Sequence, residues 1–143
     1  MRQVADYLFE ATVHNEDGVE GRAYVEGEDK LSVTVSSPVN SKPGTNPEEL
    51  FGLALTTCLN ATIESLLKAR GLTNRSKVTA KIQLRREDSG VGYYFQVDVF
   101  ASIEGMELDR ADTIVQSADK RCPVAKLTQN ASTLTLQTVP YEN

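Results

Sequence analysis

Residues 46–67, NPEELFGLALTTCLNATIESLL, are the segment that most constrains how this chain can fold. Asn46 suits an N-cap, Pro47 suits the first helical position, where no N–H is needed, and Glu49 completes a capping box. Gly71 is placed to end the helix. Apolar residues cover nearly the whole circumference in between, so the segment predicts a long helix that is central to a core or an interface.

The residues before this helix alternate between apolar and polar with a period of two. Residues 4–14, 22–27 and 30–37 have this pattern and are separated by the turn signals NEDG and GED. They are expected to form an antiparallel meander. Residues 38–45 are rich in Pro, Gly, Ser and Asn, which predicts a loop.

Longer alternating runs follow the helix. Residues 77–87 and 92–105 are joined by DSG, which predicts a hairpin, and residues 132–139 are expected to be a final strand. The order of elements predicts an α+β fold in which antiparallel sheets wrap around a long buried central helix. A chain of 143 residues with 40% hydrophobic content fits a single domain over residues 1–143.

A second helix is expected from about Asp109, the predicted N-cap, to about Lys120. The residue before a proline avoids the α region, so RCPVAKL should break this helix at Cys122 and start a short new one at Pro123. The Cys122 sulfur would then face unpaired N–H groups at a helix start, which favours the thiolate.

Composition excludes several classes of function. The net charge of -5 argues against a nucleic-acid surface. No secretory leader and no run of about 18 apolar residues are apparent, so a soluble, cytoplasmic protein without a membrane partner is expected. His14 is the one histidine, and the chain has no C-x-x-C or H-x-x-H spacing, so no metal site is expected.

The sequence leaves two roles open for the two cysteines. Structural disulfides are rare where the cytosol keeps thiols reduced, so Cys58 and Cys122 are either packed as small apolar residues or reactive. Cys58 lies roughly three turns inside its helix, where the helix dipole has faded and leucines surround it. If Cys58 is a nucleophile, a cation must reach it from elsewhere in the fold.

Two motifs together carry a resemblance to a known family. TNPEEL, followed by Cys58 ten residues after Glu48, and CPVAK ahead of a terminal strand resemble the OsmC/Ohr family of thiol peroxidases, the osmotically induced and organic-hydroperoxide-resistance proteins. The resemblance extends over essentially the whole chain. It implies an intertwined homodimer with a peroxidatic cysteine at Cys58, a resolving cysteine at Cys122 and a carboxylate at Glu48.

The resemblance also implies a reaction. A Cys58 thiolate would attack a small organic hydroperoxide, or hydrogen peroxide, to give a sulfenic acid that condenses with Cys122 into a disulfide. An external dithiol or lipoyl-type reductant would then reduce that disulfide. The enzyme would need no metal, haem or flavin cofactor.

The position of Glu48 raises a geometric question. At about 1.5 Å per residue, the ten residues between Glu48 and Cys58 span about 15 Å of a straight helix. The two side chains can share one site only if Glu48 reaches the Cys58 of another subunit or if the helix is kinked.

The chain departs from the family at the arginine that holds the peroxidatic thiolate. The hydroperoxide-resistance branch has G-R-x-G-R, and residues 18–22 read Gly-Val-Glu-Gly-Arg, so that Val19 replaces the first arginine. Arg22 remains, although strand alternation would point it to the opposite face. Lys42 and Arg121 are the other candidate cations.

This departure keeps other functions under consideration. One alternative is a slow redox sensor or a ligand-binding dimer on the same scaffold. Another is a protein in which both cysteines only pack.

Overall fold

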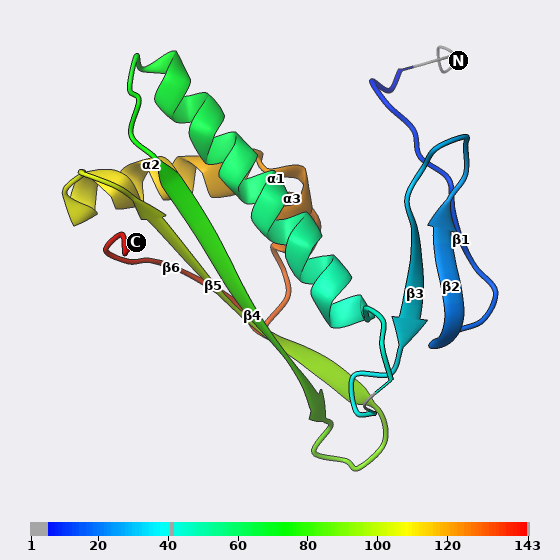
Figure 1. Cartoon of the computed structure of the whole chain (residues 1–143). Coiled ribbons are helices and arrows are strands. Elements are labelled where there is room, and N and C mark those ends of the chain that lie inside the picture. Colours follow the sequence, from blue (N-terminus) through cyan, green and yellow to red (C-terminus); the bar gives the residue numbers. More distant parts are fainter. Residues whose placement is uncertain (1–5, 41, 143) are drawn as a thin grey trace. The chain divides into compact units, whose positions relative to one another are not determined.

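The computed structural model describes residues 6–40 and 42–142. The chain divides into two compact units, residues 1–47 and 48–143. Among the described residues, each unit holds one three-stranded sheet, and the helices belong with the second unit (Figure 1). The single domain expected for residues 1–143 stays a prediction.

The N-terminal unit is an antiparallel meander. Its strands are β1 (Val13–Asn15), β2 (Glu20–Val25) and β3 (Ser32–Ser36), in that order across the sheet. At the β1–β2 turn, the side chain of Asn15 accepts a hydrogen bond from the Gly18 N–H at 2.7 Å, and Gly18 takes a φ of 62°, which favours glycine. The strands expected over residues 22–27 and 30–37 are confirmed with shifted ends.

The strand expected over residues 4–14 is wrong for residues 6–12, and residues 4 and 5 lie outside the described residues. Pairing begins at Val13, which lies opposite Val25 of β2. An alternating segment forms a strand only where a neighbouring strand offers hydrogen bonds. Within the described chain, the order β1-β2-β3 places no strand beside residues 6–12, and the apolar side chains of this stretch are exposed: Tyr7, Leu8 and Phe9.

The C-terminal unit contains the second sheet, with strands β4 (Ser76–Arg86), β5 (Tyr93–Ile103) and β6 (Leu134–Thr138). β4 and β5 form the expected antiparallel hairpin, with Ile82 opposite Val97. All three strands lie within two residues of their predicted bounds at each end, so their prediction is confirmed.

The pairing of β6 differs from the antiparallel arrangement that was expected. β6 runs parallel to β5, with Leu136 opposite Val99. Two helices connect these strands and return the chain to the same end of the sheet, and a connection of this kind gives parallel neighbours. The sheet is therefore mixed.

Helix α1 spans Pro47–Ala69, as its capping signals predict. It ends in a Schellman motif in which the Leu72 N–H donates to the Leu67 carbonyl at 2.9 Å and the Gly71 N–H donates to the Lys68 carbonyl at 3.0 Å. Gly71 has a φ of 70°, the left-handed conformation that this motif needs.

Helices α2 (Leu108–Arg121) and α3 (Pro123–Thr128) follow β5. The N-cap of α2 is Glu107 rather than the predicted Asp109, because the helix already begins at Leu108 and the Ala111 N–H donates to the Glu107 carbonyl at 2.9 Å. Asp109 lies in the first turn, where a negative charge suits the helix dipole. The predicted break before Pro123 is confirmed.

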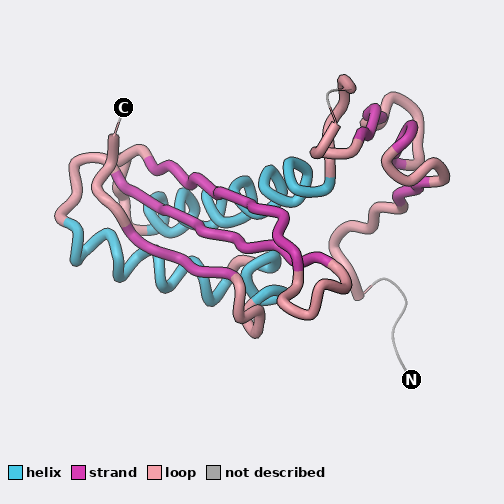
Figure 2. Tube along the Cα trace, turned by 90° about the horizontal axis from the view of Figure 1, so that it is seen from below, coloured by secondary structure: helices cyan, strands magenta, loops and turns pink. Residues whose placement is uncertain are grey.

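The core of the C-terminal unit lies between the sheet and the helices. Alternate residues of β5 are buried in one cluster with residues of α1 and α2. Figure 2 shows the backbone of these helices alongside the sheet. The core side chains come from these three elements: Val97, Val99, Ala101 and Ile103; Leu55, Leu59, Ile63, Leu66 and Leu67; and Ala111, Ile114, Val115 and Ala118.

Helix α1 is buried along one face within a single chain. Leu55, Leu59 and Ile63 are at most 2% exposed, whereas Leu53 is 65% exposed. Among the described residues, α1 is the helix long and apolar enough to cross a membrane, a property that the core helix of a soluble protein shares. The side of α1 that carries Leu53 therefore lies outside the core of this chain.

Candidate functional site: the Cys58–Cys122 pair

Cys58 is presented by α1 at the edge of the core. The adjacent Leu59 and the preceding Leu55 are buried, which fixes the rotation of the helix and leaves Cys58 half-buried beside them. The Thr62 hydroxyl donates to the Cys58 carbonyl at 2.9 Å. The sulfur is therefore carried by a rigid helix and remains partly accessible.

Cys122 is positioned by the junction of α2 and α3. It takes an extended conformation, with φ -67° and ψ 122°, because Pro123 disfavours the α region in the residue before it. Its N–H donates to the Ala118 carbonyl at 2.8 Å, and its carbonyl accepts from the Lys126 N–H at 2.9 Å. The side chain is fully buried. Both helices thus hold this one residue in place.

The structure brings the two sulfurs together. The Cys122 thiol donates a hydrogen bond to the Cys58 sulfur, with 3.1 Å between the Sγ atoms, and both cysteines are free. A disulfide would need this distance to shorten to about 2.05 Å. Residues 64 positions apart in the sequence are thus placed close enough for a small side-chain movement to join them.

The two thiols differ in burial, and the surroundings of Cys122 disfavour its thiolate. Burial is the main influence on Cys122 and raises the pKa of its thiol, and the neighbouring Cys58 sulfur raises it further. The N–H groups of Val124 and Ala125 lower the pKa but do not outweigh burial. The expectation that the start of α3 favours a Cys122 thiolate is therefore wrong, because removal from water costs the thiolate more than this short helix returns.

Glu48 lies in the first turn of α1, far along the helix from Cys58. The helix runs unbroken from Pro47 to Ala69, and Figure 1 shows a straight ribbon. The kinked helix considered as an explanation is not observed, so Glu48 does not meet the Cys58 of its own helix.

The side chains of Arg22 and Lys42 are engaged inside the N-terminal unit. Arg22 donates from Nε to the Ser32 hydroxyl at 2.6 Å, and its guanidinium lies 4.3 Å from the centre of the Tyr24 ring. Lys42 pairs loosely with an exposed carboxylate of β2, at 3.7 Å. Arg121, the remaining candidate cation, precedes Cys122 in the last turn of α2 and is exposed.

One titratable group near the pair was missed by the sequence analysis. Asp119 lies three residues before Cys122, in the last turn of α2, and burial raises the pKa of its carboxyl. An acidic residue at the C-terminal end of a helix is unfavourable by the dipole, and this mismatch was the available signal. Among the described residues, no group of three or more His, Cys, Asp and Glu side chains is arranged to hold a metal.

The burial of Cys122 and the raised pKa of its thiol predict the order in which the two cysteines are alkylated. In the reduced full chain, pulses of iodoacetamide should label Cys58 first, and Cys122 should react more slowly near neutral pH, because its side chain is fully buried and its raised pKa leaves less thiolate. Labelling of Cys122 should begin only at more alkaline pH than for an ordinary cysteine. Peptide mass spectrometry measures both sites, and equal labelling near pH 7 would contradict this account.

The sequence of this chain is similar to proteins of one known family. The model of the OsmC-like protein family matches residues 39–137. The chain is 26% identical to organic hydroperoxide resistance protein OhrA of Bacillus subtilis, covering 91% of this chain and 95% of the relative. It is 29% identical to peroxiredoxin OsmC of Escherichia coli, covering 88% and 97%.

A solved structure shares the fold. A Lactobacillus casei protein of known crystal structure is 36% identical, with a TM-score of 0.88 over 98% of this chain and 96% of that protein. The predicted α+β fold is thereby confirmed, and so is the resemblance read from TNPEEL and CPVAK. The chain belongs to the OsmC-like protein family.

Proposed function

We propose that this chain is a cysteine-based peroxidase that reduces organic hydroperoxides, with hydrogen peroxide as a second candidate substrate. The observation that carries the proposal is the 3.1 Å contact between the half-buried Cys58 thiol and the fully buried Cys122 thiol, whose pKa burial raises. The names of the relatives support it, since one is an organic hydroperoxide resistance protein and another a peroxiredoxin.

Cys58 is the residue that attacks the peroxide in this proposal. It is the more accessible thiol of the pair and accepts the hydrogen bond that Cys122 donates. Its thiolate attacks the terminal oxygen of ROOH, the O–O bond breaks, and the leaving alkoxide takes a proton to become ROH. The sulfur is oxidised by two electrons to a sulfenic acid.

Cys122 resolves the sulfenic acid. Its sulfur already touches Cys58, so it displaces the hydroxyl group and forms the Cys58–Cys122 disulfide with release of water. An external dithiol, of which a lipoyl group is one type, restores both thiols by exchange and is itself oxidised to a disulfide. The protein's own steps use no cofactor, and we place it in the cytoplasm, where dithiols are kept reduced.

The valine at position 19 favours the alternative of a slow redox sensor. Val19 stands where the family resemblance implies an arginine, and Arg22 is hydrogen-bonded to Ser32. A Cys58 that lacks a cation would be oxidised slowly, as suits a redox sensor rather than an efficient enzyme.

Turnover separates the enzyme from the sensor. With dithiothreitol present, the full chain should consume many equivalents of tert-butyl hydroperoxide, and Cys58→Ser should lower the rate by at least about 100-fold because the other thiol, Cys122, is fully buried and cannot replace it. Cys122→Ser, without reductant, should consume one equivalent for a gain of about 16 Da at Cys58, or two equivalents where the sulfenic acid is oxidised further and the gain is about 32 Da. Thr57→Ser, an exposed neighbour on α1, is the matched control and should keep full activity.

Two results would contradict the proposed peroxidase function. Consumption that is unchanged in Cys58→Ser would exclude Cys58 as the reacting group. Oxidation of Cys58 without turnover, over minutes rather than seconds, would favour the sensor.

We further propose that the chain acts as a homodimer. The side of α1 that faces away from the core carries the exposed Leu53 together with the exposed Ala54 and Ala61, and a large exposed apolar side of a core helix is typical of an interface. In this arrangement Glu48 serves the Cys58 of the partner subunit, since it cannot reach its own.

Sedimentation and complementation test the dimer. At micromolar concentration, the wild type should sediment with a mass of twice the 15.7 kDa of one chain. The Leu53→Glu variant should contain more monomer than Leu127→Glu, which is a matched change at an exposed leucine of α3. Co-expression of Cys58→Ser with Glu48→Gln should restore about a quarter of the sites, because half the dimers then hold one intact site. A stable wild-type monomer, or no restoration, would contradict the proposal.

A further inference from the structure

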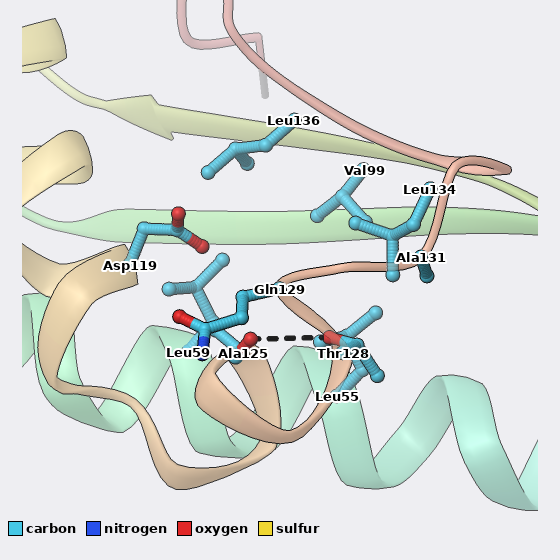
Figure 3. Close-up of a pocket in the computed structure, with 10 residues that line it drawn as sticks. All are labelled: Leu55, Leu59, Val99, Asp119, Ala125, Thr128, Gln129, Ala131, Leu134 and Leu136. Carbon is cyan, nitrogen blue, oxygen red and sulfur yellow. Dashed lines mark hydrogen bonds between the residues drawn. The ribbon is translucent and has the colours of Figure 1, made fainter.

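A cavity of about 200 Å³ lies beside the cysteine pair, inside the C-terminal unit. Figure 3 shows α1 on one side, β5 and β6 on the other, and α3 with the loop after it closing the end. Its apolar wall is formed by residues from each of these elements: Leu55, Leu59, Val99, Ala125, Ala131, Leu134 and Leu136. Neither cysteine lines it, so the cavity is separate from the thiol site.

The polar side chains that line the cavity form no hydrogen bond or ion pair with one another among the described residues. The Thr128 hydroxyl is occupied, since it donates to the Val124 carbonyl at 3.0 Å and to the Ala125 carbonyl at 3.3 Å. Asp119 points into the space in Figure 3 and, among the described residues, makes no hydrogen bond or ion pair. The amide of Gln129 lies at the same end.

Asp119 therefore presents an unpaired carboxylate to a space that is lined mainly by apolar side chains. Its position at the C-terminal end of α2 adds the negative end of the helix dipole to its own charge. The basic residues nearest in sequence, Lys120, Arg121 and Lys126, are exposed and form no ion pair with it in the described chain. An anionic ligand is disfavoured here, and a cationic hydrogen-bond donor would supply the partner that the carboxylate lacks.

The size of the cavity limits the apolar part of such a ligand. A cavity of about 150 Å³ lined by leucine and similar side chains accommodates benzene. The present cavity of about 200 Å³ has room for a body of that size with a short polar arm.

We propose that this cavity is a binding site for a small primary amine with an apolar body, whose ammonium group pairs with Asp119 and whose body packs against Leu59, Val99 and Leu134. Gln129 supplies a further hydrogen-bonding group at the polar end. The site does not depend on the peroxidase proposal, because neither sulfur takes part in it.

Benzylamine, benzyl alcohol and benzoate are matched probes, since they share the ring and differ in the charge of the polar end. Titrated into the reduced full chain and followed by ¹H–¹⁵N NMR, benzylamine should shift the amides of Leu59, Asp119 and Ala125 in a saturable way. Benzyl alcohol should bind more weakly, and benzoate should leave these amides unshifted.

Variants tie the binding to the carboxylate. Asp119→Asn should weaken benzylamine binding at least about tenfold, because the charge-assisted pair is lost while the apolar wall remains. Asp109→Asn, which removes an exposed carboxylate from the other end of α2, is the control and should bind benzylamine like the wild type. Thermal melting of each variant checks that the fold is retained.

The outcomes that would overturn the proposal are distinct. Equal binding of benzylamine by Asp119→Asn and wild type would exclude the carboxylate as its partner. Benzoate shifting the same amides would show that the cavity selects only for the ring, and benzylamine shifts confined to exposed carboxylates would show that the cavity takes no amine.

Discussion

The contact between Cys58 and Cys122 is the interaction on which the site depends, and the backbone around Pro123 creates it. Pro123 forces Cys122 out of the helical conformation, and hydrogen bonds from both flanking helices hold that residue where its sulfur meets α1. The buried face of α1 fixes Cys58 on the other side. Two sulfurs distant in sequence are thus positioned by a break in one helix and by the packing of another.

The same packing distinguishes the two thiols. Cys122 is enclosed by the core, so its pKa is raised and it remains a hydrogen-bond donor, while Cys58 stays partly open to solvent and accepts that bond. We infer a fixed division of work, in which the accessible sulfur meets the oxidant and the buried one closes the disulfide. We further infer that enclosure would protect Cys122 from oxidation by a hydroperoxide, since oxidation requires access and thiolate character.

Local signals were sufficient to predict most elements from the sequence. The capping residues of α1, Gly71 at its end and Pro123 after Cys122 act within a few positions of the chain, and each gave the correct boundary. The features that could not be predicted depend on distant partners. Residues 6–12 alternate but lack a neighbouring strand in the described chain, and β6 is parallel because of the path that α2 and α3 take. Burial of Cys122 likewise reversed an argument made from its helix end alone.

The roles proposed for Cys58 and Cys122 can be tested by the mass of the reduced full chain after brief treatment with one equivalent of organic hydroperoxide. We predict the loss of two hydrogens, about 2 Da, within seconds, and a tryptic fragment in which Cys58 and Cys122 are linked within one chain. Addition of oxygen to either cysteine with the other thiol left free would contradict the proposed Cys58–Cys122 cycle, as would a disulfide formed only between chains.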